Sequence, residues 1–165
     1  MQTGLSLWKE GPQRITIFID GCARGNPGPA GCGVIIADAG GRTILTKARY
    51  LGKATNNVAE YTALIDGLRE AAGLGAREVA IRTDSELVER QLKGEYKVKD
   101  AKLKVLFAEA RRLSRGFAVL DVAHVERENN KEADRLANQA VDSFLGVKDE
   151  RGAGVVPLAT DSKQK

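Results

Sequence analysis

The sequence has few of the residues that mark secreted, zinc-binding or membrane proteins. It contains two cysteines and one histidine in 165 residues, too few for a disulfide framework or a zinc finger. It also lacks an apolar run near the roughly 20 residues of a membrane helix, and its N-terminus does not resemble a secretory signal. We therefore expect a cytoplasmic protein without a membrane partner. Whether Cys22 and Cys32 pair across a hairpin stays open.

The remaining composition is that of a folded globular protein. Hydrophobic residues make up 42% of the chain and charged residues 29%, which suits one domain with a buried core. The formal net charge of +4 favours a polyanionic partner, although many basic proteins bind no nucleic acid. We predict a leader over residues 1–13, a domain over 14–145 and a flexible tail over 146–165. We expect a monomer, because no heptad pattern or large apolar stripe suggests assembly.

The order of strand and helix patterns predicts an α/β protein. Residues 14–19 form a β-branched and aromatic run, typical of a strand buried on both faces. Further strands are expected at 31–38, 42–51, 78–83 and 117–125, and helices at about 57–72, 84–92, 103–113 and 131–144. Three strands followed by alternating helices and strands predict a five-stranded mixed sheet. Its first three strands are antiparallel, and helices pack on both faces.

Local signals also predict details of the helices. Asn56 or Asn57 is expected to cap the first helix. Thr83 and Glu86 have the spacing of a capping box at the second. Phe144 is placed on the apolar face of the last helix, facing the core.

Four acidic residues stand where carboxylates are unexpected. Asp20 ends an otherwise apolar strand, and Asp84 closes the fourth strand. Glu60 and Asp134 lie on the flanks of apolar helix faces rather than opposite them. The four acids are therefore expected to converge at one end of the central strands. Clustered carboxylates repel one another unless cations lie between them, and oxygen ligands suit Mg²⁺ or Mn²⁺.

Each acid also has an ordinary structural explanation. Asp20 fits an Asx-turn into the glycine-rich loop, and Glu60 fits a solvated acid near a helix N-terminus. Asp84 fits a helix N-cap, and Asp134 fits a surface ion pair. No one of the four establishes a site by itself.

Four sequence segments carry a resemblance to a known family. FIDGCARGNPGPAG, TNNVAEYTAL, TDSELVERQL and RENNKEADRLANQA occur in this order between about Ile15 and Ala140. Any one would be a weak match, but the ordered set closely resembles type 1 ribonuclease H. The resemblance implies a ribonuclease H-like fold and hydrolysis of the RNA strand of RNA–DNA hybrids by two Mg²⁺ ions, with Mn²⁺ as a substitute. It implies 5′-phosphate and 3′-hydroxyl products, and it maps the metal ligands onto Asp20, Glu60, Asp84 and Asp134.

The same resemblance suggests residues that contact the substrate. Asn26, Asn56 and Glu86 match positions that contact the minor groove or RNA 2′-hydroxyls, the group that distinguishes RNA from DNA. Asn26 and Thr55 match residues that hold a DNA phosphate. Turn and cap chemistry explains both asparagines equally well.

The chain departs from many relatives in two places. A flexible loop with a proton-transferring histidine is replaced by a short connection, where His124 is expected to belong to the fifth strand. Arg127 lies nearer the expected mouth of the site and is a candidate electrostatic substitute. A lysine-rich turn over residues 93–104 stands where some relatives insert a basic protrusion, so the chain resembles the compact branch of the family. That turn is either a solvated face or a contact for the DNA strand.

Two other functions remain as alternatives. The first is a nucleic-acid-binding module with this fold that does not cleave, which the presence of all four acids disfavours. The second is a metal-dependent nuclease of the integrase or resolvase type, which resembles this chain less in the GNPGPAG and TNN segments.

Overall fold

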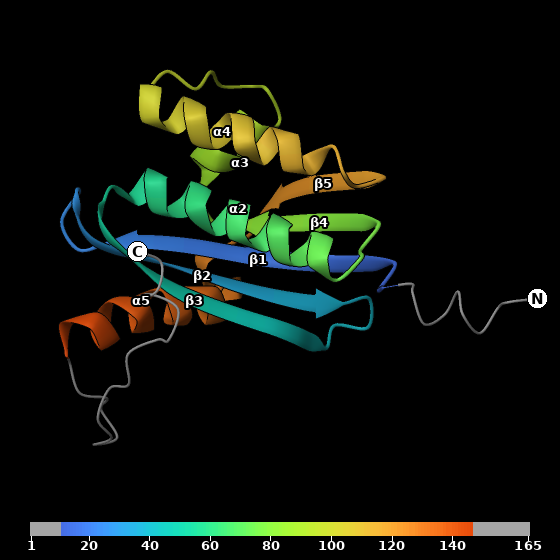
Figure 1. The fold of residues 1–165 in the computed structure, drawn as a ribbon, viewed down its shortest axis with the longest axis horizontal. Coiled ribbons are helices and arrows are strands. Elements are labelled where there is room, and N and C mark those ends of the chain that lie inside the picture. Colours follow the sequence, from blue (N-terminus) through green and yellow to red (C-terminus); the bar gives the residue numbers. More distant parts are fainter. Residues whose placement is uncertain (1–10, 147–165) are drawn as a thin grey trace, which may run out of the picture.

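The computed structural model describes residues 11–146 of the chain (Figure 1). Residues 1–10 and 147–165 lie outside this range, and with them most of the predicted leader and tail. The chain forms these elements in order: β1 (Arg14–Ala23), β2 (Gly28–Asp38), β3 (Thr43–Ala54), α2 (Asn56–Gly73), β4 (Glu78–Thr83), α3 (Glu86–Leu92), α4 (Ala101–Ser114), β5 (Val119–His124), the 3₁₀ turn η1 (Arg127–Asn129) and α5 (Lys131–Leu145).

The strands form one mixed sheet in the order β3-β2-β1-β4-β5. β1 pairs with β2, and β2 with β3, in antiparallel register. β4 runs parallel to both β1 and β5. The predicted α/β class and the antiparallel arrangement of the first three strands are confirmed. Two irregularities in the pairing of β2 with β3 leave Ile44 and Leu51 of β3 without an opposite residue.

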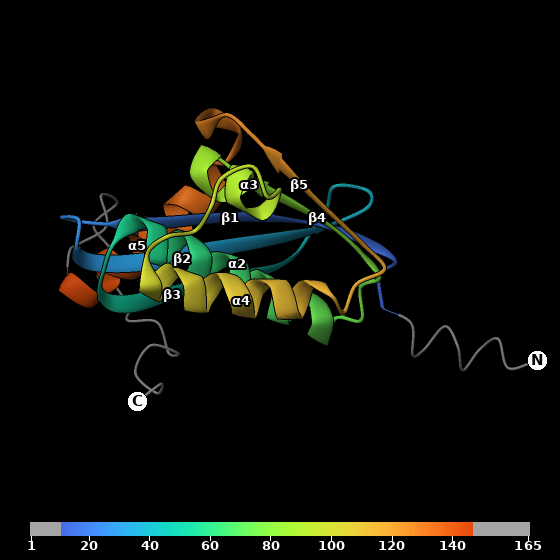
Figure 2. The same cartoon turned by 90° about the horizontal axis from the view of Figure 1, so that it is seen from above.

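Helices cover both faces of the sheet, as the sequence predicted. α2, α3 and α4 lie on one face, where α4 packs against α2 (Figure 2). α5 lies on the other face against β2. Two glycines of β2 permit its close approach, because a Cβ on Gly31 or Gly33 would lie 2.6 or 2.4 Å from a carbonyl oxygen of α5. This approach brings the first turn of α5 to the end of β1.

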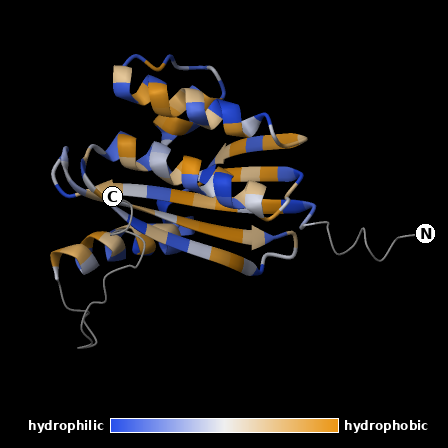
Figure 3. Cartoon of the chain, viewed as in Figure 1, coloured by the Kyte–Doolittle hydropathy of each residue, from blue (hydrophilic) through white to orange (hydrophobic). Residues whose placement is uncertain are grey.

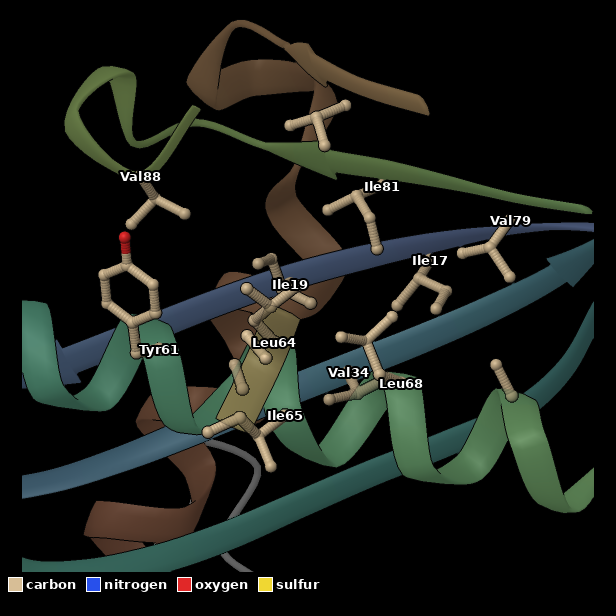
Figure 4. Packing of buried hydrophobic residues seen from close by; sticks show 14 of the residues in the cluster. Ile17, Ile19, Val34, Tyr61, Leu64, Ile65, Leu68, Val79, Ile81 and Val88 are labelled. Carbon is tan, nitrogen blue, oxygen red and sulfur yellow. The ribbon is translucent and has the colours of Figure 1, made fainter. Parts of the chain in front are cut away.

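The main core lies between the sheet and α2. Ile15, Ile17 and Ile19 of β1 are completely buried, and Ile17 and Ile19 face Leu64 and Leu68 of α2 (Figure 4). Bands of hydrophobic residues alternate with hydrophilic ones along α2 and α4, as expected for helices with one face inward (Figure 3). Within residues 11–146, no helix combines the length and apolar character needed to cross a membrane.

The structure corrects the predicted helix caps. Thr55, not Asn56 or Asn57, caps α2, and its hydroxyl accepts a hydrogen bond from the Val58 N–H. The Asn56 side chain instead accepts from the N–H of Ala23, at the end of β1. The tertiary contact therefore decides which residue of the TNN segment becomes the cap.

The predicted capping box is also wrong. Ser85 caps α3, and its hydroxyl accepts from the Val88 N–H. Thr83 is the last residue of β4, and its hydroxyl accepts from the Ser85 N–H. Because Thr83 still belongs to the strand, α3 begins two residues later than a cap at Thr83 would place it, and Ser85 becomes the cap.

The core position predicted for Phe144 is also wrong, since its side chain is 55% exposed. Its ring stacks on Tyr50 with centroids 3.9 Å apart. The last turn of α5 lies over β3, the outermost strand, and only one face of the ring is covered there.

The two cysteines do not pair. Cys22 follows Gly21 in β1, and Gly21 is opposite Cys32 of β2. Because side chains alternate between the faces of a sheet, the two thiols lie on opposite faces. Both are free, and Cys32 is buried with its sulfur 3.6 Å from Asp66 Oδ2.

Candidate active site

The four acids stand on four elements that meet at one end of the sheet. Asp20 lies in β1, Glu60 in the second turn of α2, and Asp134 in the first turn of α5. Asp84 follows β4, whose last residue, Thr83, is in register with Ile19 of β1. Because β1 and β4 are parallel, Asp20 and Asp84 lie side by side. Asp20 does not end its strand as predicted, since β1 continues to Ala23 in register with β2.

Three of the acids form a tight cluster. Oxygens of Asp20, Glu60 and Asp84 all lie within 4.8 Å of one another. Asp20 and Glu60 are only 5% and 7% exposed, although carboxylates are rarely buried without a partner. Glu60 reaches Asp20 because Gly21 of β1 has no side chain and lets α2 approach the strand closely. A Cβ on Gly21 would lie 2.4 Å from the backbone of α2. The Gly21 N–H donates to Glu60 Oε2 at 3.1 Å.

The fourth acid, Asp134, borders the same site without entering this three-acid cluster. It is half-buried. Its Oδ1 accepts from the side-chain amide of Asn138, one turn further along α5, at 3.2 Å. All four acids line one cavity of about 410 Å³. The solvated position considered for Glu60 does not hold, because its side chain is buried. The Asx-turn considered for Asp20 does not hold either, because β1 continues past it to Ala23.

Burial makes the charged form of the clustered acids costly. The pKa of Asp20 is raised, first by burial and then by the negative charge of Glu60. The pKa of Glu60 is also raised by burial, and the hydrogen bond from the Gly21 N–H offsets part of this rise. The charge of Asp84 raises both, whereas that of Arg127 lowers the pKa of Glu60. The site therefore carries more negative charge than the protein itself neutralises.

Asn130, which the sequence interpretation did not select, joins two parts of the site. Its side-chain amide is buried and donates to the Ile19 carbonyl of β1 at 2.9 Å and toward Asp84 Oδ2 at 3.5 Å. It precedes α5 without capping it through its side chain. The sequence signal for it was the asparagine pair before the last helix, which suggests only a cap.

The structure separates the two candidates for the missing loop histidine. Arg127 lines the acidic cavity. His124 is exposed at the end of β5, as predicted for its strand. Unlike Arg127, it is not among the residues that line the acidic cavity. The catalytic role of either residue stays a prediction.

The predicted substrate-binding residues fall into three places. Asn56 lines the acidic cavity. Asn26 and Thr55 line a second cavity of about 540 Å³, together with Lys53 and Lys102. Asn57 lines both cavities, which are therefore adjacent. Glu86 is exposed and bound to Arg90 on α3.

The acidic cluster fits divalent cations. Its donors are carboxylate oxygens, the ligands that Mg²⁺ and Mn²⁺ prefer. One of them, Glu60 Oε1, is buried and has no hydrogen-bond partner among the described residues, although buried polar atoms are normally paired. A cation between the three acids would satisfy this oxygen and remove the repulsion that raises the pKa values.

Comparisons with known proteins agree with this geometry. The family model described as "Reverse transcriptase-like" matches residues 18–140. A bifunctional protein of Mycobacterium tuberculosis is 45% identical over 79% of this chain, but the match spans only 36% of that protein. Ribonuclease HI of Halobacterium salinarum is 42% identical over 78% of this chain and 65% of its own length. The chain thus spans about a third to two thirds of these curated relatives.

Solved structures extend the likeness to the fold. The crystal structure of ribonuclease H1 from Halobacterium salinarum superposes with a TM-score of 0.77, at 42% identity, covering 78% of this chain and 98% of that one. LC11-RNase H1, solved in complex with an RNA/DNA hybrid, gives a TM-score of 0.76 at 46% identity, covering 79% and 99%. With the acidic cluster at the end of β1 and β4, these matches show that the chain belongs to the type 1 ribonuclease H family.

Proposed function

We propose that this protein hydrolyses the RNA strand of RNA–DNA hybrids. The observation that carries the proposal is the cluster of Asp20, Glu60 and Asp84 in a chain of this family. A relative at 46% identity was solved with an RNA/DNA hybrid bound, which supports the same substrate class here. An acidic cluster alone would repel a polyanion, so substrate binding requires cations at the site.

We assign two Mg²⁺ ions to the site, with Mn²⁺ as a substitute, held by Asp20, Glu60, Asp84 and Asp134. Ions bound there would activate a water molecule and stabilise the leaving 3′-oxygen, giving 5′-phosphate and 3′-hydroxyl ends. Asp20 and Glu60 supply ligands that give up their protons when cations bind. Arg127 supplies a positive charge at the cavity wall where phosphate approaches.

Substrate recognition is assigned to the two adjacent cavities. Asn56 borders the acidic cavity, close to the RNA strand that is cut. Asn26 and Thr55 border the second cavity, where Lys53 and Lys102 add positive charge suited to a phosphate of the DNA strand. The exposed Glu86 is assigned to the minor groove, where 2′-hydroxyls offer donors to a carboxylate. A monomer and a cytoplasmic location remain predictions.

The decisive experiment compares substrates and metals. The purified protein is incubated with labelled RNA–DNA hybrid, double-stranded RNA or double-stranded DNA, in Mg²⁺, Mn²⁺ or EDTA. We expect cleavage of the hybrid's RNA strand that EDTA abolishes and that Asp20→Asn removes. Binding of the hybrid without cleavage in either metal would identify the non-catalytic module instead. Preferential cleavage of double-stranded DNA would indicate the integrase-like alternative.

A further inference from the structure

The end of β1 and the glycine-rich loop after it contact both α2 and α5. These two helices lie on opposite faces of the sheet, and each carries an acid of the site. Towards α2, the Ala23 N–H donates to Asn56 Oδ1 at 2.9 Å, and Asn26 Oδ1 accepts from the Asn56 N–H at 3.0 Å. Towards α5, Arg24 of the same loop donates to Asn138 and Asp142. The loop therefore spans the end of β1 and fixes α2 relative to α5.

The contacts of Arg24 with α5 lead to an acid of the site. Its Nη1 lies 2.6 Å from Asp142 Oδ1, and its Nη2 lies 3.0 Å from Asn138 Oδ1 and 3.2 Å from the Asn138 carbonyl. The Asn138 amide nitrogen in turn donates to Asp134 Oδ1 at 3.2 Å. A continuous set of hydrogen bonds thus runs from Arg24 through Asn138 to Asp134.

The direction of these bonds is fixed by the chemistry of arginine. A guanidinium group only donates hydrogen bonds, so Asn138 must turn its oxygen toward Arg24. Its NH₂ group then faces Asp134. The opposite orientation would place the Asn138 oxygen against the Asp134 carboxylate and the Asn138 NH₂ group against the Arg24 guanidinium. The Asn138 amide nitrogen also donates to the Asp134 carbonyl at 3.0 Å, so Arg24 and this carbonyl together fix the orientation in which Asp134 receives a donor on Oδ1.

We propose that Arg24 and Asn138 are positioning residues that hold Asp134 for cation binding. Asp134 stands outside the three-acid cluster, so its carboxylate needs support to share in the site. Hydrogen bonds to ligating carboxylates orient them and commonly change metal affinity about 10- to 100-fold. The inference rests on the proposed function, because it assumes that Asp134 is a ligand. It adds that hydrogen bonds connect the loop that bears Asn26 to the proposed ligand Asp134 on α5.

A purely electrostatic or structural role makes different predictions. Arg24 and Asp142 form an ion pair whose side chains are 35% and 37% exposed, and such pairs contribute little to stability. If only the charge of Arg24 mattered, its removal would tighten cation binding, because a repelling positive charge is lost. A positioning role predicts the opposite sign.

The test is a calorimetric titration of Mg²⁺ and Mn²⁺ into the full-length protein without substrate. We expect Asn138→Ala to weaken cation binding about 10-fold and Arg24→Ala roughly three- to tenfold. The double variant should be no weaker than Asn138→Ala alone, because both act through one hydrogen-bond chain. Thermal unfolding of the metal-free variants checks the fold, and alanine is favourable inside a helix.

Three matched controls separate the explanations. Gln139→Ala removes an exposed amide from the same helix. Arg135→Ala removes a cation beside Asp134 that pairs with Glu132. Asp142→Asn removes the charge from the ion pair with Arg24 while leaving Asn138 in place. We expect all three to bind cations within about twofold of wild type, below the effect of a lost supporting hydrogen bond.

The outcomes separate this inference from the proposed function. Tighter binding in Arg24→Ala, or unchanged binding in Asn138→Ala, overturns the positioning role while wild-type cleavage of the hybrid stands. If the losses of cation affinity in the two single variants add in the double variant, Arg24 does not act through Asn138. A wild-type protein that binds no divalent cation and cleaves no hybrid overturns the proposed function, and the inference with it.

Discussion

Replacing Asp20 by asparagine should stabilise the metal-free protein while abolishing its activity. The Asp20 side chain is 5% exposed and faces two further carboxylates, so its pKa is raised by burial and by the charge of Glu60. Asparagine has nearly the same shape but no charge to bury. The substitution therefore removes a cost of folding without opening a cavity.

The sign of the effect follows from proton linkage. Below the usual aspartate pKa of about 3.9, both folded and unfolded chains hold the proton, and Asp20 contributes no pH dependence. As the pH rises above that value, the unfolded chain releases the proton more readily than the folded one, and the wild type loses stability. Each pH unit of this difference is worth about 1.4 kcal/mol, so roughly 4 kcal/mol at pH 7 is the upper limit. Because relaxation of the site reduces it, we expect Asp20→Asn to gain about 1–3 kcal/mol.

The assay is urea denaturation in EDTA from pH 3.5 to pH 8, with the free energy of unfolding compared at each pH. The advantage of Asp20→Asn should be near zero at the acid end and should grow towards neutrality. Asp121→Asn is the control, since Asp121 is 62% exposed and paired with Arg82 at the surface. An equal gain in the free energy of unfolding at every pH, or none at pH 7, would refute the argument that burying the Asp20 charge destabilises the metal-free protein.

Three further predictions concern other parts of the molecule. In hybrid cleavage assays, Arg127→Ala should lower kcat about 10-fold or more, whereas His124→Ala should leave it nearly unchanged. The reverse result would show that His124, not Arg127, takes the role of the loop histidine of relatives. Arg49→Ala should destabilise the protein by about 2–4 kcal/mol in urea denaturation, because Asp66, which is 3% exposed, loses two hydrogen bonds; a change below 0.5 kcal/mol would contradict it. Mg²⁺ affinity should weaken as the pH falls from 8 to 6, because the two buried acids with raised pKa must lose protons on binding; calorimetry showing constant affinity would exclude this.

The sequence predicted what periodicity and motif order determine. The apolar run through Ile17 and Ile19 predicted a central strand, and both residues are completely buried. The position of Glu60 on the flank of a helix predicted that it would face the strands rather than water. Its oxygens do reach Asp20, because Gly21 allows α2 to approach.

Features that depend on distant contacts were not predictable from local patterns. Thr55 became the cap of α2 because the Asn56 side chain contacts Ala23 of β1, and Ser85 became the cap of α3 because β4 extends to Thr83. The role of Asn130 requires the Ile19 carbonyl, from the opposite end of the sequence, at 2.9 Å. The bonds from Arg24 to α5 likewise join segments that no local pattern relates.

The irregular pairing of β3 bears on whether this edge of the sheet can pair with another molecule. β3 forms one edge of the sheet, where exposed backbone donors and acceptors could recruit a strand from another molecule. The unpaired Ile44 and Leu51 interrupt its hydrogen-bonding repeat at two points, and Lys47 and Lys53 place charges along it. A second copy would therefore find no long, regular template there, which discourages aggregation through this edge.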